Sequence, residues 1–240
     1  MDSLNNMNQQ VALLARLRAN ARVLDAGCGV GGLSLWLVDK YGADVDSITV
    51  CAEQVESARQ FAEQDNLNER TAFHQMDYTC TDFPDDAFDA VVAIESVCYA
   101  KDKDAFLREA SRVLKPGGRL VVADEFRTEG ISVTRSDERL IQSWLSGWAV
   151  PDLATRKMFC QAATDAGFAE VELQDITAFV QPSVNRLCLL SLLCYPGEWG
   201  LWKMQKRTDL QHGNIRAAIN LWFALRKKLC FYGLFSATKA

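Results

Sequence analysis

The sequence predicts a protein of the α/β class, with a mostly parallel sheet of seven strands, helices on both faces, and a helical cap inserted before the last strand. Two observations predict it. Along the first 124 residues, apolar runs of strand length alternate with segments of helical period, as in a parallel sheet covered by helices. The first of these strands also enters a glycine-rich loop, residues 27–32, directly before a helix.

Length and composition agree with this fold class. The chain has 240 residues, of which 49% are hydrophobic and 24% are charged. A chain of this size buries a sizeable core without metal ions or disulfides. Collagen-like, coiled-coil and disordered classes are therefore excluded.

The alternation assigns each element of the first half of the chain. Apolar runs predict five strands, at residues 22–25, 47–51, 71–75, 88–93 and 119–124. Residues of helical period predict four helices, at residues 11–18, 31–41, 53–64 and 102–114. The last of these helices is expected to stop at Pro116-Gly117-Gly118.

The pattern changes after residue 124. Helices are expected at 136–148 and 153–166, and strands at 170–176 and 230–238. Residues 177–228 are rich in Leu, Trp and Arg. Because an unstructured loop of that length is uncommon in a compact domain, they are expected to form a helical cap over the open end of the sheet.

Composition also narrows the partners and the location. The formal net charge is −5 without a sustained Lys or Arg run, so no nucleic acid partner is expected. The eight cysteines form no C-x-x-C pair and the chain has two histidines, so no metal site is expected. Scattered cysteines behind a polar start without a signal peptide predict buried thiols and a cytoplasmic location. No stretch is expected to span a bilayer.

The glycine loop is the most informative segment, Asp25-Ala26-Gly27-Cys28-Gly29-Val30-Gly31. Glycine is needed where a ligand approaches the backbone or where φ is positive, and the amides of the following helix attract anionic groups. A dinucleotide site has G-x-G-x-x-G and an acid at the end of the second strand. Here the spacing is G-x-G-x-G and that strand ends in Cys51, which disfavours a nicotinamide cofactor. A turn without a ligand is the other interpretation of such a loop.

Four segments, in order, resemble the class I S-adenosylmethionine-dependent methyltransferases. They are the glycine loop, Gln75-Met76-Asp77-Tyr78, Phe88-Asp89-Ala90-Val91 and Leu114-Lys115-Pro116-Gly117-Gly118. The resemblance covers residues 11–176 and implies a Rossmann-like fold with S-adenosyl-L-methionine as cofactor. Residues 48–54 and 93–99 are most similar to the branch of sterol, tocopherol and isoprenoid C-methyltransferases, whose members usually carry more residues before the first strand.

The resemblance also implies a domain organisation. The chain is expected to form a single domain, 1–240. Residues 1–130 would be its cofactor-binding half, and residues 131–176 and 229–240 the remainder of the sheet. Residues 177–228 would be the substrate cap.

Roles in cofactor binding follow from the resemblance. Asp25, Gly27, Cys28 and Gly29 are expected around the amino-acid portion of the cofactor, with the Asp25 carboxylate serving its ammonium group directly or through water. Cys51 and Gln54 are expected among the cofactor-binding residues after the second strand, with Gln54 at the ribose, since an amide both donates and accepts hydrogen bonds. Glu53 is the alternative ribose partner, and both can equally be ordinary residues of a first helical turn.

The adenine is assigned to the residues after the third strand. The Asp77 carboxylate would accept from the exocyclic amine, and the backbone amide of Tyr78 would address the ring. Val50 and Met76 would sandwich the purine, although simple core packing explains them equally well.

Glu95 is the leading acid or base, because it follows an apolar strand at the sheet edge where ligands of α/β folds bind. Desolvation there would raise its pKa. A hydrogen bond to the cofactor or to a neighbouring turn is the alternative role. Tyr99 would assist it, and His212 in the cap is a candidate base on the substrate side.

Other candidates are weaker. Asp124 and Glu125 end a strand at the same edge, where solvated acids are the commoner outcome. Trp144 and Trp148 share a helical face and suit either a pocket or the core. His74, inside a strand, is expected to be structural.

The expected reaction is therefore methyl transfer from S-adenosylmethionine to a hydrophobic small molecule of isoprenoid, sterol-like or quinone-like type, preferably at carbon. The apolar cap favours such an acceptor and is compatible with transient membrane contact and with a homodimer. The alternatives are O- or N-methylation of a natural product, an NAD-dependent oxidoreductase, and a non-catalytic scaffold that binds the cofactor.

Overall fold

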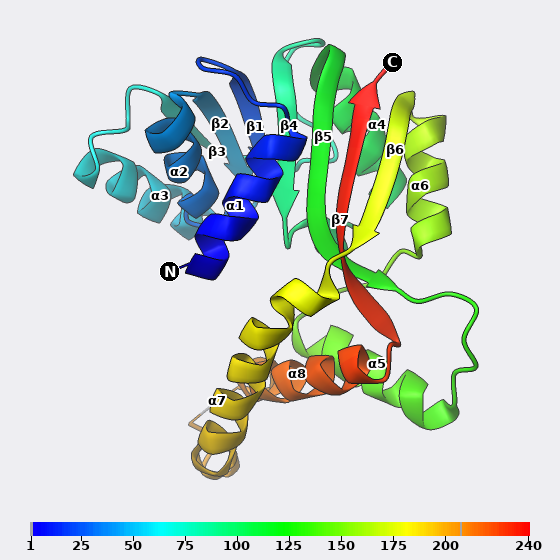
Figure 1. Ribbon diagram of the computed structural model, residues 1–240. Coiled ribbons are helices and arrows are strands. Elements are labelled where there is room, and N and C mark those ends of the chain that lie inside the picture. The colour runs from blue at the N-terminus through cyan, green and yellow to red at the C-terminus, as the bar shows by residue number, and fades with distance from the viewer. Residues whose placement is uncertain (1, 207) are drawn as a thin grey trace. The chain divides into compact units, whose positions relative to one another are not determined.

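The computed structural model describes residues 2–206 and 208–240 and contains the expected seven-stranded sheet (Figure 1). The strand order is β3-β2-β1-β4-β5-β7-β6. The strands are β1 Arg22–Ala26, β2 Asp44–Thr49, β3 Thr71–Gln75, β4 Phe88–Ile94, β5 Leu114–Arg127, β6 Phe168–Asp175 and β7 Cys230–Lys239. The predicted α/β, Rossmann-like architecture is confirmed.

Eight α-helices and a short 3₁₀ turn connect these strands within the described part of the chain. The α-helices are α1 Asp2–Leu14, α2 Gly32–Tyr41, α3 Ala52–Gln64, α4 Lys103–Val113, α5 Arg135–Gly147, α6 Arg156–Asp165, α7 Thr177–Lys203 and α8 Asp209–Arg226. The 3₁₀ turn is η1, Val97–Tyr99, which the sequence pattern did not predict.

Parallel pairing places four strand ends at one edge of the sheet. Leu24 of β1 lies opposite Asp46 of β2 on one side and opposite Val91 of β4 on the other. β2 also pairs in parallel with β3, and β4 pairs in parallel with β5. β7 runs opposite to its neighbours β5 and β6 (Figure 1). The carboxyl ends of β1 to β4 therefore meet, which is where ligands of open α/β sheets bind.

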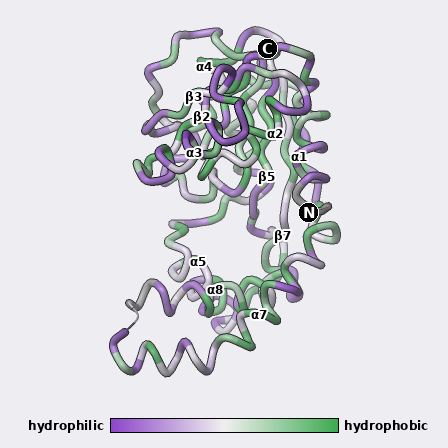
Figure 2. The backbone as a smooth tube through the Cα atoms, turned by 90° about the vertical axis from the view of Figure 1, so that its left-hand side faces the viewer, coloured by the Kyte–Doolittle hydropathy of each residue, from purple (hydrophilic) through white to green (hydrophobic). Residues whose placement is uncertain are grey.

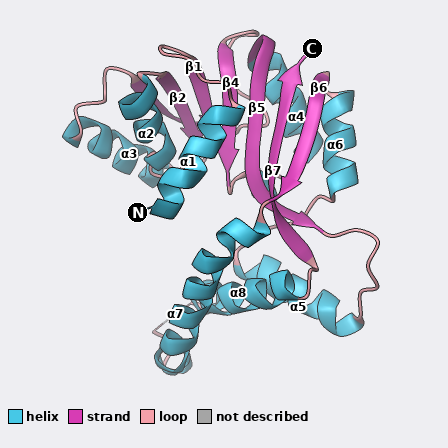
Figure 3. Cartoon of the chain, in the orientation of Figure 1, coloured by secondary structure: helices cyan, strands magenta, loops and turns pink. Residues whose placement is uncertain are grey.

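Helices cover both faces of the sheet. In Figures 1 and 3, α1 crosses the front of the sheet, and α4 and α6 lie behind it. α4 forms because the Asp102 carboxylate caps its first turn, accepting from the Ala105 amide at 2.8 Å, and because apolar residues recur along one side. Its buried residues are Phe106, Leu107, Ala110 and Val113.

Three predicted boundaries are wrong for local reasons. β2 begins at Asp44 and ends at Thr49 instead of spanning 47–51. Its first residues include two aspartates, so a run of apolar residues does not mark where the strand begins. α1 begins at Asp2 rather than at residue 11. β5 begins at Leu114 rather than at residue 119: Phe88 lies opposite Leu114 and Ala90 opposite Arg119, so the Pro-Gly-Gly segment bulges out of the ladder.

The chain divides into two compact units. The sheet unit comprises Met1–Asp124, Lys157–Gln174 and Leu234–Ala240, and the helical unit comprises Glu125–Arg156 and Asp175–Gly233. The expectation of one domain, 1–240, with a cap at 177–228 stays a prediction.

The helical unit is held by close contact between α5 and α8. A Cβ on Gly147 would lie 2.7 Å from the Gly213 carbonyl oxygen, so the two backbones approach each other where only glycine fits. Asn220 donates to the Ser143 hydroxyl at 2.9 Å, and the Lys227 ammonium lies 2.6 Å from the Asp137 carboxylate. α7 packs along α8, where the Trp222 indole donates to Asn185 at 2.7 Å.

One expectation about α7 is wrong. By length and composition α7 is able to cross a membrane, whereas no such stretch was expected from the sequence. Hydrophobic stretches appear along α7 in green in Figure 2. Arg186, Glu198 and two prolines interrupt its apolar residues, so the sequence has no unbroken apolar run of the length of a membrane span.

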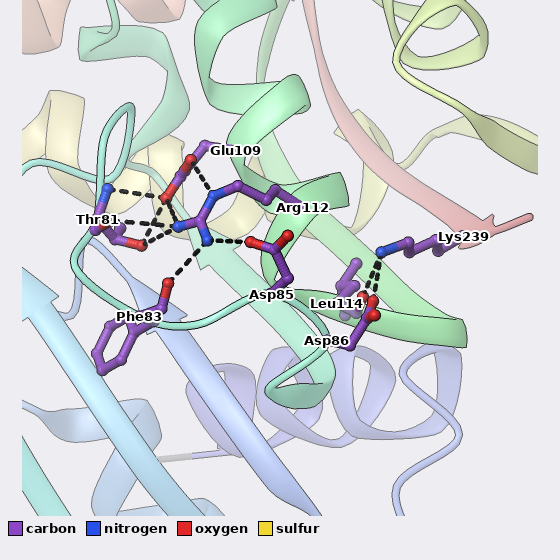
Figure 4. Close-up of polar contacts among 8 residues, drawn as sticks. All are labelled: Thr81, Phe83, Asp85, Asp86, Glu109, Arg112, Leu114 and Lys239. Carbon is purple, nitrogen blue, oxygen red and sulfur yellow. Dashed lines mark hydrogen bonds and ion pairs between the residues drawn. The ribbon is translucent and has the colours of Figure 1, made fainter.

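Arg112 of α4 anchors the loop that follows β3 (Figure 4). Its guanidinium makes a bidentate contact with Glu109, at 2.6 and 3.0 Å, and donates to Asp85 at 2.6 Å and to the Phe83 carbonyl at 2.8 Å. Glu109 also accepts from the Thr81 amide and hydroxyl. Burial alone would raise the pKa of Glu109, but these hydrogen bonds hold it below its usual range.

We expect Arg112→Gln to lower the free energy of unfolding by about 2 kcal/mol at neutral pH, because it leaves the Glu109 carboxylate without its cation. The folded-state pKa of Glu109 is depressed, so this stabilisation is present above the unfolded pKa and is lost as pH falls through the folded one. Urea denaturation at neutral and acidic pH measures the loss and its decrease in acid.

Arg108→Gln is the matched control, since that side chain is 63% exposed and lies 3.7 Å from an exposed Asp102. It should cost less than about 0.5 kcal/mol. Equal losses in the two variants would contradict the role given to Arg112.

Candidate active site

A cavity of about 660 Å³ opens at the carboxyl ends of the parallel strands in the sheet unit. It is lined by residues from the loops that follow β1, β2, β3 and β4. They are Gly27, Cys28, Gly29, Thr49, Val50, Gln54, Asp77, Tyr78, Thr79, Ile94, Glu95, Ser96, Tyr99, Ala100 and Lys101. Its volume lies within the usual range of small-molecule sites.

The glycine loop turns sharply against the end of β4. The amides of Gly27 and Cys28 both donate to the Ile48 carbonyl, at 2.9 and 3.0 Å. Gly27 has φ +95°, and a Cβ there would lie 2.3 Å from Cβ of Ser96. The Ser96 hydroxyl donates to the Ala26 carbonyl at 2.7 Å. Only glycine fits at position 27, because the loops after β1 and β4 touch at this point.

Asp25 lies beneath this turn and not on the cavity wall. It is 2% exposed and accepts a 2.6 Å hydrogen bond from the Ser34 hydroxyl, which in turn accepts from Ser47 at 2.8 Å. Burial raises its pKa to about 6, although the bond from Ser34 opposes the rise. Asp25 is therefore a buried acid whose pKa lies well above that of an exposed aspartate.

Cys28 and Tyr78 line the cavity in their neutral forms. Burial, reinforced by the Asp25 carboxylate, raises the pKa of the Cys28 thiol above its ordinary value. Burial also raises the pKa of Tyr78, whose hydroxyl donates to the Ser96 carbonyl at 2.8 Å. A thiol held protonated is a poor nucleophile, so Cys28 contributes backbone and shape.

The residues after β2 present an amide to the cavity. The Thr49 hydroxyl donates to Oε1 of Gln54 at 2.7 Å, which leaves the amide nitrogen of Gln54 without a partner among the described residues. Val50 lines the cavity and is 66% exposed, so it does not belong to the core. Cys51 is not a lining residue; its thiol donates to Glu53 at 3.1 Å.

Asp77 is held by the turn that it starts. One of its carboxylate oxygens accepts from the amide and the hydroxyl of Thr79, at 2.8 and 2.7 Å. The other oxygen has no hydrogen-bond partner in the structure as described. Met76 is half-buried, donates its amide to the Thr49 carbonyl and is not among the lining residues.

Glu95 and Tyr99 share the wall formed after β4. Glu95 has φ +50°, an uncommon conformation for a residue with a side chain, and its amide donates to the Ala123 carbonyl at 2.8 Å. Strained backbone of this kind collects at functional sites. The Glu95 side chain is exposed, and the desolvation expected there is not observed.

Neither histidine is among the residues that line the cavity. His212 belongs to the helical unit, where it is buried and stacks on Trp202 at 4.6 Å. His74 contacts Asp46 at 3.1 Å and packs edge-on against Phe83, as expected of a structural histidine.

Two of the weaker candidates are buried. Asp124 is not solvated as expected: it is 2% exposed and accepts from the Cys98 amide at 2.8 Å. Trp144 is fully buried and packs edge-on against Trp148, so core packing accounts for it.

Several lining residues were not predicted, namely Thr49, Thr79, Ile94, Ser96, Ala100 and Lys101. Most of these residues directly adjoin a predicted residue. Their position just after a strand would therefore have been enough to predict them. Ser96 in particular follows Glu95, at the edge where ligands were expected.

The cavity fits S-adenosylmethionine by its chemistry. Gly29 has φ +55° and no atom within 4 Å of where a Cβ would stand, so the loop leaves open space for a ligand. The amide nitrogen of Gln54 and one oxygen of Asp77 provide a donor for a hydroxyl and an acceptor for an amine. Gly27, Cys28, Gly29, Val50, Gln54, Asp77 and Tyr78 would hold the cofactor here, with Asp25 beneath them.

We expect Gly27→Ala to lower the free energy of unfolding by about 3 kcal/mol, since it adds a clash with Ser96 to a left-handed backbone. Binding of S-adenosylmethionine, measured by calorimetry, should be lost. Gly32→Ala is the control: a Cβ at position 32 would have no atom within 4 Å, and alanine favours the helix that this residue begins. Tolerance of both substitutions would disprove the close approach at position 27.

Comparison with known proteins agrees with this geometry. Residues 24–122 match the family described as methyltransferase domain. A methyltransferase, GfsG, from Streptomyces halstedii is 41% identical over 118 residues, which are 49% of this chain and 42% of that protein. A 2-methyl-6-phytyl-1,4-hydroquinone methyltransferase from Synechocystis is 33% identical over 159 residues, 65% of this chain and 49% of that protein. The chain thus spans less than half the length of these relatives.

The fold is also found among solved structures. Geranyl diphosphate C-methyltransferase from Streptomyces coelicolor, solved with S-adenosyl-L-homocysteine, superposes with a TM-score of 0.76 at 19% sequence identity. The match covers 98% of this chain and 76% of that structure. Residues 24–122 therefore match the sequence model of a methyltransferase domain, and the chain as a whole shares the fold of this solved structure.

Proposed function

We propose that this protein methylates a hydrophobic small molecule of isoprenoid, sterol-like or quinone-like type, preferably at carbon. The observation that carries the proposal is a single cavity whose walls hold most of the predicted cofactor residues together with two predicted catalytic residues, Glu95 and Tyr99. The relative from Synechocystis, which acts on a phytyl hydroquinone, supports an acceptor of this class.

The reaction needs alignment more than covalent catalysis. S-adenosylmethionine supplies an activated methyl group, which an acceptor attacks in line. The backbone of Gly27 and Gly29 and the side chains of Gln54 and Asp77 would fix the cofactor. Most of the binding geometry is set before any ligand arrives, because Thr49 and Thr79 already orient Gln54 and Asp77.

Glu95 and Tyr99 would then serve the acceptor. Methylation of an alkene carbon leaves a carbocation, which an aromatic face stabilises and a carboxylate base deprotonates. Tyr99 is 47% exposed and Glu95 is exposed on the same wall, so both side chains are accessible to an acceptor in the cavity. With a hydroxyl or amine acceptor the same carboxylate would take the proton, and O- or N-methylation is the alternative reaction.

We also propose a cytoplasmic location. All eight cysteines are free thiols. Cys98, Cys188 and Cys230 are buried as expected, whereas Cys80 and Cys194 are exposed, so the expectation of buried thiols is wrong for these two. Free buried thiols suit a reducing compartment.

The affinity for S-adenosylmethionine should fall as pH drops through about 6, where the folded-state pKa of Asp25 lies. Protonation removes the negative charge that would attract the cofactor's ammonium group, and each further pH unit should cost about tenfold in affinity. Calorimetry across this range measures the effect, which Asp25→Asn should abolish.

The stability of the cofactor-free protein should change in the opposite sense. The folded-state pKa of Asp25 lies above its unfolded value, so its contribution to stability is full at low pH and is lost as pH rises through about 6. An affinity profile that is the same for wild type and Asp25→Asn would remove Asp25 from the cofactor site.

Glu95→Gln should lower methyl transfer by about a hundredfold or more, because the amide cannot accept the proton. Labelled methyl transfer into a panel of isoprenoids, sterols, quinols, phenols and amines measures the rate, and calorimetry should show cofactor affinity almost unchanged. Glu56→Gln, an exposed acid on α3 that does not line the cavity, is the matched control. A Glu95→Gln variant as active as wild type would remove Glu95 as the base.

A further inference from the structure

α7 exposes most of its large apolar residues, whereas Ser191 and Glu198 are buried. Along the helix the residues turned away from solvent recur at helical spacing: Gln181, Val184, Cys188, Ser191, Tyr195, Glu198 and Trp202. The exposed large residues are Phe179, Leu187, Leu189, Leu190, Leu192, Leu193, Trp199 and Leu201. A helix that packs in a soluble core shows the reverse polarity.

Contacts with α8 fix this orientation. The rings of Tyr195 and Trp202 lie 5.8 and 4.6 Å from the ring of His212, and Asn185 accepts from the Trp222 indole. The leucine side therefore faces away from α8. Leu189, Leu190 and Leu193 are each at least half exposed, so this surface is large and apolar.

The exposed charged residues of α7 and of the turn after it are cationic. Arg186, Lys203 and Lys206 are exposed, whereas Glu198, the one acid of α7, is buried. Arg186 shares the exposed leucine side by its spacing from Leu189, Leu190 and Leu193. Lys203 lies 4.6 Å from the Trp199 ring. Neither Arg186 nor Lys203 has an ion pair with an acid within residues 2–206 and 208–240.

Topology argues for a helix that lies on a membrane and does not cross it. β6 precedes α7 and β7 follows α8, and both strands belong to the same sheet. A crossing by α7 would require α8 to cross back. Among the described residues α7 alone passes the test of length and hydropathy, and α8 carries Arg216 and Arg226.

We infer that the exposed side of α7 is a docking surface for an anionic lipid bilayer, where Leu189, Leu190 and Leu193 enter the interface and the neighbouring cations meet lipid phosphates. Apolar side chains together with Lys and Arg are the combination that binds such surfaces. Negative lipids of the cytoplasmic leaflet attract a basic segment of this kind. The inference does not depend on catalysis, because lipid binding is measured without an acceptor.

Flotation with vesicles tests it. The full-length protein should float with vesicles of one part phosphatidylglycerol to two parts phosphatidylcholine, and bind pure phosphatidylcholine about tenfold more weakly. High salt should weaken the first interaction. The double variant Leu189→Ser and Leu193→Ser should lower binding to the anionic vesicles by about tenfold.

Leu13→Ser is the matched control, since Leu13 on α1 and Leu189 are both 58% exposed. It should float like wild type. Circular dichroism and cofactor binding by calorimetry show that each variant is folded, and they test the proposed function separately from lipid binding.

Three results would overturn the inference. They are failure of the folded wild type to bind anionic vesicles, equal binding to neutral vesicles, and equal loss in Leu13→Ser. A concentration-dependent dimer in sedimentation, abolished by the α7 variant while flotation is unchanged, would assign the surface to a second copy instead.

Discussion

The close approach of two neighbouring loops is the constraint on which the site depends. β1 and β4 pair in parallel, so their carboxyl ends lie side by side, and the Ser96 hydroxyl ties the second loop to the Ala26 carbonyl of the first. No side chain fits at position 27. The glycine is therefore required first by the fold, and the open backbone that a ligand can approach is a consequence of the same contact.

From this junction the other groups are positioned by short local hydrogen bonds. Tyr78 joins the β3 loop to the β4 loop through the Ser96 carbonyl. The Thr49 hydroxyl donates to the amide oxygen of Gln54, and Thr79 donates to one carboxylate oxygen of Asp77. The amide nitrogen of Gln54 and the other oxygen of Asp77 are left available for a ligand. A site built in this way loses little entropy when a ligand binds, because its polar groups are already oriented.

Sequence patterns predicted the elements that are apolar and local. β3 has the expected boundaries, and the glycine loop, Gln54, Asp77, Glu95 and Tyr99 all line one cavity. These residues come together because parallel strands bring their following loops to one edge of the sheet, so position in the chain determines position in space.

The predictions that are wrong concern features that depend on polar strand residues or on contacts between residues far apart in the sequence. β2 ends two residues earlier than expected, at Thr49, so Cys51 belongs to the start of α3, and it does not line the cavity. The bulge in β5 arises from how Phe88 and Leu114 pair, which no local pattern contains. The burial of His212 is decided by aromatic residues of α7, a separate helix.

α7 shows why periodicity alone could not assign its faces. A helix with leucines on most sides has no dominant apolar stripe, so its sequence is compatible with burial in a core, with a membrane and with a partner. The neighbouring helix resolves the choice: α8 presents His212 and Trp222, which bond or stack with the polar and aromatic side of α7. The leucines are left on the outside together with Arg186, and that pairing of apolar surface with positive charge favours a lipid surface over a protein core.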